Sequence, residues 1–517
     1  MTALPELSTD DAGATGRHRL AEAGGLLCLV LLAVALRLVP IVFAPSMNWG
    51  DEIFQTTEQA HRLVYGYGLV PWEFQVGMRS WLLPGAIAGL IDIARMFGDG
   101  PAYYLPIIAV GLGLLSAAPV VCCFLWCRRF FGLAPAFVAA SVVAVAPELV
   151  YFGARALNEV VAAHLLVIAF YLIAPGYQVA DRRRLVGAGA LLGIIALLRL
   201  QLAPAVAVAA LWPTGDDWRR RLPAIFGGGV LALAAGAAFD WLTLGQPLAS
   251  VWRNLYYNLY LGISSEFSVE PWLYYLLGEL GVWLAAAPFV LLLVALGARR
   301  LPALLAVLLV IVAVHSAIPH KEYRFIYPAV VPAMVLVAVA LAELTRLAGE
   351  ALHRRGVRRR VAATLAAVVM ASGWCAVAFG VWSGAALAAL RSRAHNELLA
   401  MSFVQRMTPP CGIGLYGENA WVRYGGYTYL HRPVPMYWPA DEGELTADAA
   451  AFDTLIYDSA DVAARPISAT LGFTPAQCFG EICVARRTGG CTPRPLPQMW
   501  FPPQLRAPPD GAGPGRQ

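Results

Sequence analysis

The chain has 517 residues, of which 59% are hydrophobic and 14% charged, and its formal net charge is +5. Soluble domains average about 25% charged residues, so this composition excludes an ordinary soluble protein. The apolar residues form continuous runs of roughly 17–25 residues, as a hydrocarbon core of ~30 Å requires, and they do not alternate as in a membrane barrel. The sequence therefore predicts an all-α polytopic membrane protein.

The first segment, residues 1–20, is polar and is predicted to be a disordered cytoplasmic tail. The apolar run after it lacks a small-residue cleavage site, so we interpret it as a retained helix. Hydropathy predicts about eleven membrane helices, which would form one domain over 21–387. They are expected near 22–44, 104–126, 133–150, 160–176, 185–198, 202–214, 222–243, 273–297, 301–317, 325–347 and 361–387.

Short basic segments recur between alternate predicted helices. Threading the helices through a bilayer puts all of these segments on one side, which the positive-inside rule makes cytoplasmic. They are Arg17 with Arg19, Arg128 with Arg129, Arg182 to Arg184, Arg219 to Arg221, Arg299 with Arg300, and "HRRGVRRR" at 353–360. The opposite side then holds the loops 45–103 and 244–272, the turns "ARALNE", "LRLQLAP" and "HKEYR", and the chain from about 388.

The long first extracytoplasmic loop, 45–103, is the expected catalytic loop. From Glu52 to Tyr65 its apolar residues recur at helical spacing, which predicts a helix lying along the membrane surface. Asp51 precedes that helix, where a carboxylate caps the helix end or serves as a general base. Glu52 is the neighbouring catalytic candidate and points to a different helix face. His61, on a polar face, is a candidate substrate contact.

Other polar residues of the same side are also candidate substrate contacts. Trp72, Glu73 and Arg79 suit either a sugar-binding wall or an aromatic belt at the membrane interface. Arg155 and Asn158 lie at the outer end of a predicted helix, where ionisable groups are costly and are either paired or functional.

Arg155 also has a structural interpretation, and two further polar residues are candidates. A pair between Arg155 and Glu159 is the structural alternative for "ARALNE". Arg199, in "LLRLQ", either marks a loop or binds an anion, and Asp240 faces the same side.

The segment "HKEYR" holds three potential cations in five residues on the side where the positive-inside rule disfavours them. Lys321 is the only lysine of the chain. His320, Lys321 and Arg324 suit a phosphate clamp, because Lys supplies a point charge and Arg a bidentate fork. Side chains that snorkel to the membrane interface are the alternative.

The C-terminal part predicts a small soluble α/β domain over 388–495, followed by a disordered tail, 496–517. Its four cysteines, Cys411, Cys478, Cys483 and Cys491, predict one or two disulfides of undetermined pairing. No zinc spacing or nucleotide-binding loop occurs. The sequence therefore predicts no required cofactor, leaves a divalent cation open, and gives no indication of nucleic acid as a partner.

Several of these motifs resemble a known family. The stretch "GDEIFQTTEQAHRLVYGYGLVPWEFQVGMRSWLLP" resembles the first-loop signature of glycosyltransferase family 22, the lipid-phosphate-mannose-dependent mannosyltransferases of GPI anchors and asparagine-linked glycans. "HKEYRFIYP" is similar to the His-Lys-Glu-x-Arg-Phe block of that family, and "ALNEVVA", "LLRLQLAP" and "FDWLTLG" look like its weaker blocks. The resemblance covers approximately residues 20–345. The sequence departs from the family pattern at two positions: Gly50 stands where the family commonly has Pro, and Phe74 where it has a second Trp.

The resemblance implies a GT-C fold and an enzyme that transfers mannose from polyprenyl- or dolichyl-phosphate mannose to a glycan or glycolipid hydroxyl, with inversion to an α-linkage. Asp51, with Glu52 beside it, matches the catalytic position, and Arg199, His320, Lys321 and Arg324 match donor-phosphate contacts. A flippase for lipid-linked sugars, or a GT-C enzyme with another sugar donor, is the alternative. The alanine- and arginine-rich usage is typical of a GC-rich bacterium, which would place the site on the periplasmic face of the cell membrane; in a eukaryote it would face the ER lumen.

Overall fold

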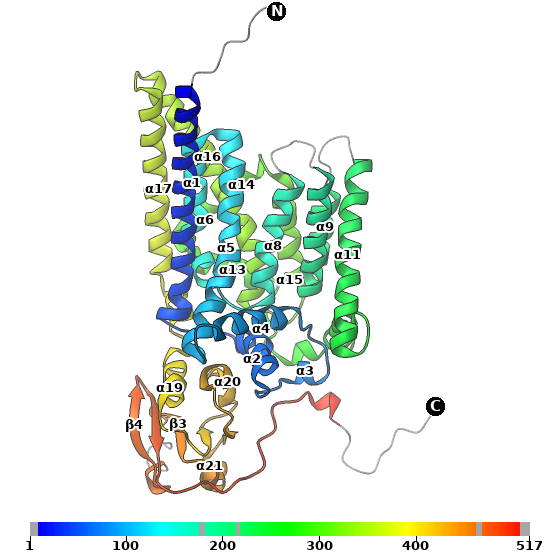
Figure 1. Ribbon diagram of the computed structural model, residues 1–517, viewed down its shortest axis with the longest axis vertical. Coiled ribbons are helices and arrows are strands. Elements are labelled where there is room, and N and C mark those ends of the chain that lie inside the picture. Colours follow the sequence, from blue (N-terminus) through cyan, green and yellow to red (C-terminus); the bar gives the residue numbers. More distant parts are fainter. Residues whose placement is uncertain (1–8, 175–180, 213–217, 462–467, 507–517) are drawn as a thin grey trace, which may run out of the picture. The chain divides into compact units, whose positions relative to one another are not determined.

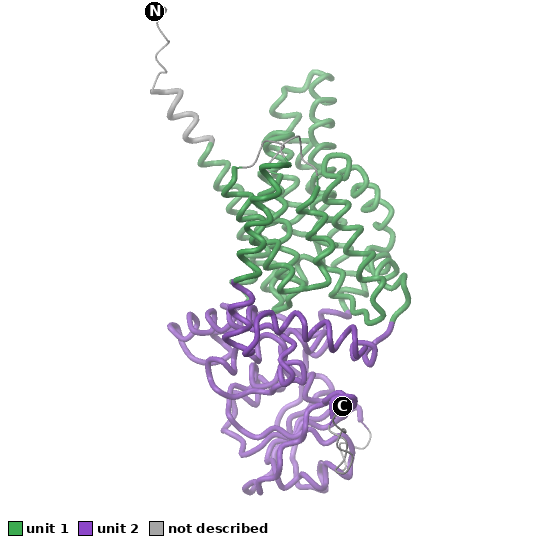
Figure 2. The backbone as a smooth tube through the Cα atoms, turned by 90° about the vertical axis from the view of Figure 1, so that its right-hand side faces the viewer, with its two compact units in different colours: residues 1–41, 109–234, 270–388 green, residues 42–108, 235–269, 389–517 purple. Residues whose placement is uncertain are grey.

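A computed structural model describes residues 9–174, 181–212, 218–461 and 468–506. The chain forms two compact units, which are coloured separately in Figure 2. Unit 1 comprises Met1–Ile41, Ala109–Ala234 and Glu270–Ala388, and unit 2 comprises Val42–Ile108, Ala235–Val269 and Ala389–Gln517. This grouping places the first loop with the C-terminal segment, whereas the sequence predicts a division at residue 388.

Unit 1 is a bundle of helices, labelled in Figure 1. Its helices, some of which continue into unit 2, are α1 (Thr9–Leu38), α5 (Pro101–Phe131), α6 (Leu133–Val145), α7 (Pro147–Phe152), α8 (Asn158–Ile173), α9 (Arg182–Leu198), α10 (Ala203–Leu211), α11 (Trp218–Leu244), α13 (Tyr274–Trp283), α14 (Ala287–Ala298), α15 (Pro302–Ala317), α16 (Tyr327–Arg354) and α17 (Arg359–Trp382).

Each of the eleven predicted segments contains helix, but fewer are spanning helices by themselves. Within the described ranges, six helical segments are long and apolar enough to cross a membrane: Arg19–Phe43, Pro101–Phe131, Trp218–Leu244, Tyr274–Ala298, Tyr323–Arg354 and Arg359–Trp382. Others are shorter, and the predicted helix 133–150 divides into α6 and α7. Pro147 begins α7, where it has no N–H to continue the α6 ladder. The chain is a multi-pass membrane protein, and the count of eleven stays a prediction.

Small residues allow helices of unit 1 to pack closely. A Cβ atom at Gly189 of α9 would overlap the backbone carbonyl of Ile225 in α11, and one at Gly228 of α11 would overlap that of Val186. Helices in lipid associate through such small-residue contacts, because apolar burial gives little advantage there. Helix α16 is apolar around its circumference and is the most buried of the six spanning segments.

Unit 2 contains short helices and one mixed sheet. The helices are α2 (Glu58–Tyr65), α3 (Trp72–Gln75), α4 (Leu82–Arg95), α12 (Ala249–Leu255), α18 (Ala385–Ser392, which begins in unit 1), α19 (His395–Arg406), α20 (Gly426–Leu430) and α21 (Glu442–Asp448). The strands are β1 (Ile413–Leu415), β2 (Met436–Tyr437), β3 (Thr454–Asp458), β4 (Thr474–Phe479) and β5 (Ile482–Arg486), in the order β2-β1-β3-β5-β4. The β2-β1-β3 pairs are parallel, and β3-β5-β4 are antiparallel. Leu398 and Met401 of α19 pack in the same core as Ile413, Ile456 and Val484 of the strands.

The four C-terminal cysteines form two disulfides, Cys411–Cys491 and Cys478–Cys483. The second joins directly opposed residues of β4 and β5. The prediction of one or two disulfides is confirmed.

Both segments predicted to be disordered contain residues that the structure describes, and the predicted disorder stays a prediction. Helix α1 begins at Thr9, inside the predicted tail 1–20, because extending an existing helix is far easier than nucleating one. Within the predicted tail 496–517, Trp500 packs against Trp72, with ring centroids 6.0 Å apart. Contacts between aromatic rings are stabilising, so this packing favours an ordered conformation around Trp500. Residues 1–8 and 507–517 lie outside the described residues.

Candidate functional site

The first loop, 45–103, begins with an irregular helix. The carbonyl of Gly50 accepts hydrogen bonds from the N–H groups of Ile53 (3.0 Å) and Phe54 (2.8 Å), which closes the first turn. A single π-helical turn, Ile53–Thr57, follows and leads into α2. The predicted helix from 52 to 65 is therefore present, with a π-turn at its start, a feature that is frequent at functional sites.

A cavity of about 400 Å³ opens beside this turn, and we call it the acidic cavity. Its polar wall includes Asp51, Gln55 and Glu73, and its other residues are Gly50, Phe54, Pro71, Trp72, Glu266, Phe267, Asn419, Trp421, Val422 and Trp500. All belong to unit 2. The volume lies within the range of roughly 300–1,000 Å³ that is usual for small-ligand sites. Three carboxylates and five aromatic rings therefore surround one space.

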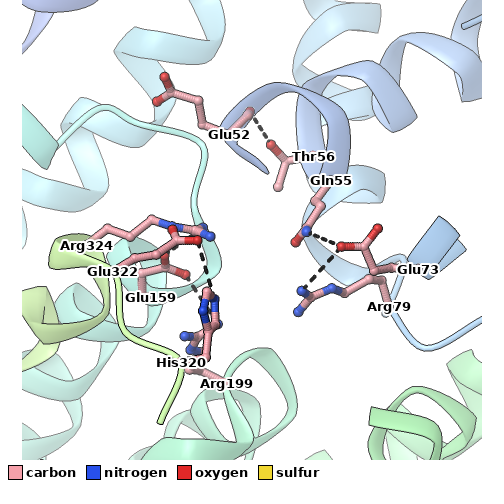
Figure 3. Close-up of polar contacts among 10 residues, drawn as sticks. All are labelled: Glu52, Gln55, Thr56, Glu73, Arg79, Glu159, Arg199, His320, Glu322 and Arg324. Carbon is pink, nitrogen blue, oxygen red and sulfur yellow. Dashed lines mark hydrogen bonds and ion pairs between the residues drawn. The ribbon is translucent and has the colours of Figure 1, made fainter. Parts of the chain in front are cut away.

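Glu73 is the buried carboxylate of this cavity (Figure 3). Its Oε1 accepts a hydrogen bond from Gln55 Nε2 at 2.9 Å, and Arg79 NH2 lies 4.0 Å from the same oxygen. Burial raises the pKa of Glu73 to about 7; Arg79 opposes this shift and Asp51 adds to it. The Glu73 carboxyl is therefore partly protonated near neutral pH and can both accept and donate hydrogen bonds.

Glu52 is not among the residues that line the acidic cavity. Figure 3 shows its carboxylate directed away from Gln55 and Glu73, while its backbone carbonyl accepts a 2.5 Å hydrogen bond from Thr56 Oγ1. Of the two adjacent catalytic candidates, only Asp51 lines this cavity.

Unit 1 contains a second cluster, of arginines and glutamates, which we call the Arg–Glu cluster (Figure 3). Glu159 accepts a hydrogen bond from Arg324 NH1 at 3.0 Å, and Arg199 NH1 lies 3.9 Å from its other oxygen. Glu322 contacts Arg324 Nε at 2.5 Å and His320 Nε2 at 3.5 Å. Burial opposes ionisation of Glu322, but Arg324 and His320 together lower its pKa to about 2. The two carboxylates hold the cationic groups in place.

Lys321 is held differently from the arginines. Its ammonium donates to the carbonyls of Ile318 (2.7 Å) and Glu270 (2.8 Å) and lies 3.5 Å from that of Pro319. Only 3% of the residue is exposed. These contacts tie the "HKEYR" segment to Glu270, so they give Lys321 a structural role, and its predicted phosphate contact stays a prediction.

Other predicted contacts lie outside the acidic cavity. In unit 2, His61 is fully buried, with its ring nitrogens 3.2 Å from the Tyr67 carbonyl and 3.1 Å from His431 Nδ1. Burial lowers the pKa of His61 to about 4, so its ring is neutral at pH 7. Asp240 accepts hydrogen bonds from the N–H (2.9 Å) and hydroxyl (2.6 Å) of Ser250, which anchors the start of α12.

In unit 1, the Arg155 guanidinium lies 4.1 Å from the Tyr151 ring centroid. Asn158 is the first residue of α8. The structural alternative expects a pair between Arg155 and Glu159, and the structure shows Glu159 paired with Arg324 and Arg199, which come from other elements.

Sequence reasoning did not single out Asn419, Trp421 and Trp500, although all three line the acidic cavity. No motif signalled them. For Trp500 the only available signal is an aromatic residue in a segment that otherwise predicts a disordered tail.

The described residues contain one group with the spacing of a metal site: Cys411, Asp453 and Cys491. Its two sulfurs are joined in a disulfide and are not available as thiolate ligands. The expectations that no cofactor is required and that a divalent cation is left open stay predictions.

The comparisons with known proteins identify the family. The model of the Alg9-like mannosyltransferase family matches residues 28–431. The chain belongs to the Alg9-like mannosyltransferase family. This confirms the resemblance to GPI and asparagine-linked-glycan mannosyltransferases, and membership of a transferase family favours an enzyme over a flippase.

Two relatives illustrate the extent of the similarity. GPI mannosyltransferase 3 of Drosophila melanogaster is 28% identical over 320 residues, 59% of this chain and 54% of that protein. GPI alpha-1,2-mannosyltransferase 3 of Bos taurus is 23% identical over 436 residues, 83% of this chain and 76% of that protein. The alignment with the Drosophila relative thus spans about half of that relative's length.

Among solved structures, apo ArnT from Cupriavidus metallidurans matches with a TM-score of 0.60 and 15% identity, covering 90% of this chain and 98% of ArnT. ArnT bound to undecaprenyl phosphate matches with a TM-score of 0.58 at the same identity, covering 91% and 99%. At this identity the likeness shows the fold alone. The predicted GT-C fold, mostly helical with a small sheet, is confirmed at that level.

Proposed function

We propose that this family member is a membrane mannosyltransferase that moves mannose from polyprenyl- or dolichyl-phosphate mannose to a hydroxyl of a glycan or glycolipid, with inversion to an α-linkage. Family membership supports the sugar and the reaction class. The observation that carries the proposal is Asp51 in the wall of the acidic cavity, among sugar-compatible aromatic rings. The sugar donor and its lipid are inferred from the resemblance.

Asp51 is the proposed general base. As the acceptor oxygen forms its bond to C1 of the mannose, Asp51 accepts the hydroxyl proton. The bond between C1 and the phosphate oxygen breaks on the opposite face, which inverts the anomeric centre. Positioned general bases typically contribute 10²–10⁴ in rate. Glu73, with its pKa near 7, is proposed to hold the acceptor by hydrogen bonds.

The Arg–Glu cluster is the proposed site of the donor phosphate. Arg199 and Arg324 carry planar forks that suit phosphate oxygens, and His320 adds a further donor. Glu159 and Glu322 fix the arginine side chains before the donor binds, so little reorganisation is required. Charge developing on the leaving phosphate is then stabilised by groups already in position.

The proposed site faces the extracytoplasmic side, the periplasm in a bacterium. The bias of the basic loops supports this orientation. The disulfides Cys411–Cys491 and Cys478–Cys483 also support it, because disulfides persist in oxidising compartments.

The test uses membranes containing the wild-type chain or Asp51→Asn, with radiolabelled polyprenyl-phosphate mannose and a host glycolipid extract. We expect label in the acceptor with wild type and a loss of about 10²–10⁴ in rate with Asp51→Asn. Asp92→Asn is the matched control, since Asp92 is an exposed acid in α4. Undiminished transfer by Asp51→Asn at equal expression would refute the role of Asp51, and no transfer by wild type would count against the function.

A further inference from the structure

The acidic cavity is completed by segments far apart in the sequence. Glu266 and Phe267 lie between α12 and α13. Asn419 and Trp421 lie between β1 and α20, and Trp500 lies beyond β5, the last strand. All of them belong to unit 2 together with Asp51. None of these five residues belongs to the first-loop motif or to the "HKEYR" segment.

The segment around Trp500 is held in place at two points. Its ring lies 6.0 Å from Trp72 and 5.2 Å from Phe267 between centroids. Four residues on, Gln504 Nε2 donates a 2.8 Å hydrogen bond to Glu266 Oε1. The segment is thus fixed against the cavity wall.

Asn419 and Trp421 of the lining also offer groups for a polar ligand. Asn419 has a φ of 50°, in the left-handed region that non-glycine residues rarely adopt. Such backbone conformations are concentrated at functional sites. Trp421 packs edge-on to Phe54 at 4.9 Å, and its buried indole N–H lacks an acceptor within the described residues.

The charge of the lining disfavours anionic sugars as ligands. Asp51, Glu73 and Glu266 are acidic, and no described lysine, arginine or histidine lines the cavity. A phosphorylated or carboxylated sugar would meet the carboxylates of Asp51 and Glu266 there, and Arg79, which lies 4.0 Å from Glu73 Oε1, is not a lining residue, so binding is disfavoured. Aromatic rings together with carboxylates and an amide instead match the apolar faces and hydroxyls of a non-anionic sugar.

We propose that Asn419, Trp421 and Trp500 form the acceptor subsite, which binds the terminal, non-anionic sugar of the acceptor glycan beside Asp51. The rings of Trp421 and Trp500 contact the apolar face of the sugar, and Asn419 hydrogen-bonds its hydroxyls. This inference rests on the proposed function, because only a transferase has an acceptor. The binding of the sugar itself can be measured without catalysis.

The first test measures binding to the full chain in lipid nanodiscs by saturation-transfer NMR, with methyl α-D-mannopyranoside and its 6-phosphate as probes. We expect contact with the mannoside and none with the phosphate. Trp500→Ala and Asn419→Gly should weaken mannoside binding roughly three- to tenfold. Glycine tolerates the backbone conformation of residue 419, so this variant removes the amide without strain. Leu496→Ala is the control, because Leu496 is exposed in the same segment and does not line the cavity.

The second test measures mannose transfer by the same variants. We expect the KM for the acceptor to rise in Trp500→Ala and Asn419→Gly while the KM for the lipid-linked donor stays unchanged. Transfer with unaltered acceptor KM in both variants, or equal binding of the phosphorylated probe, would overturn the subsite and leave the proposed function standing. Mannoside binding with the expected dependence but without transfer by wild type would overturn the function and leave the subsite standing.

Discussion

At the scale of single residues, neighbouring carboxylates have different surroundings. Asp51 lines the acidic cavity and Glu52 does not, because consecutive residues of a helical turn point in different directions. Glu73, from a separate short helix, supplies the second carboxylate of the polar wall. Gln55 connects the two segments through its hydrogen bond to Glu73.

Glu73 makes stability depend on pH. Its pKa rises from 4.5 to about 7 on folding, so the native state binds more protons than the unfolded state between these values. The stabilisation is complete below pH 4.5 and is lost as the pH rises to 7, by up to about 3 kcal/mol. Thermal unfolding midpoints in nanodiscs should therefore fall across this range more steeply for wild type than for Glu73→Gln. Parallel pH curves for the two proteins would contradict the assignment.

Arg324 offers a test of the Arg–Glu cluster. Arg324 contacts both Glu159 and Glu322 and has a planar fork that suits phosphate. Lysine keeps the positive charge but lacks this fork, so it cannot make all of these contacts at once. For Arg324→Lys we expect kcat/KM for the lipid-linked donor to fall about 10- to 100-fold, as for a lost charge-assisted hydrogen bond. Arg346→Lys, a change in a more exposed ion pair of α16, is the control. Equal kcat/KM for both variants would remove Arg324 from the donor site.

At the scale of elements, Glu58 links the first loop to the C-terminal segment. Its fully buried carboxylate accepts hydrogen bonds from the N–H groups of Leu69 (2.8 Å), Tyr427 (3.1 Å) and Thr428 (2.8 Å), and from the Thr428 hydroxyl (2.8 Å). Burial raises its pKa, although these donors oppose the shift. Helix α2, which follows the π-turn, is thereby held to α20.

Glu58→Gln replaces an acceptor oxygen by an NH₂ group that faces other donors. Each buried donor left unpaired costs about 1–3 kcal/mol, so we expect a clear loss of stability in unit 2. Hydrogen exchange should report faster exchange at Leu69, Tyr427 and Thr428. Glu481→Gln, at an exposed turn, should exchange like wild type. Unchanged protection at these three amides in Glu58→Gln would show that the carboxylate does not hold the two segments together.

At the scale of the whole molecule, the lipid bilayer determines which residues must be apolar. The six long apolar helices satisfy their backbone groups internally, as a membrane requires. The mixed sheet and both disulfides instead belong to unit 2.

Orientation gives the prediction at this scale. Arg355 belongs to a basic segment and Glu418 to the C-terminal segment, and both are exposed. In right-side-out spheroplasts, a membrane-impermeant maleimide should label Glu418→Cys but label Arg355→Cys only after lysis. The chain without either substitution provides the background from its own cysteines. The reverse pattern would invert the assigned topology and place the proposed site on the cytoplasmic side.

Much of the candidate site could be predicted from local sequence. The first-loop motif led to Asp51, Trp72 and Glu73, which share one cavity, and "HKEYR" led to Arg324 and His320. His61 and Asp240, which were predicted as substrate contacts, do not line the acidic cavity. Polar residues of these types also serve as buried structural groups. Sequence does not tell whether a histidine faces a ligand or another histidine.

The sequence by itself determined the membrane class, the positions of the apolar helices, the family and the pairing potential of the cysteines, because these depend on local composition and on motifs of contiguous residues. Only the tertiary structure decided that Asp51 rather than Glu52 lines the cavity and that Glu159 pairs with Arg324 and Arg199. It also decided that Asn419, Trp421 and Trp500 share the wall of Asp51. These contacts join residues that lie on separate elements, and side-chain packing in three dimensions, which no local pattern encodes, selects them.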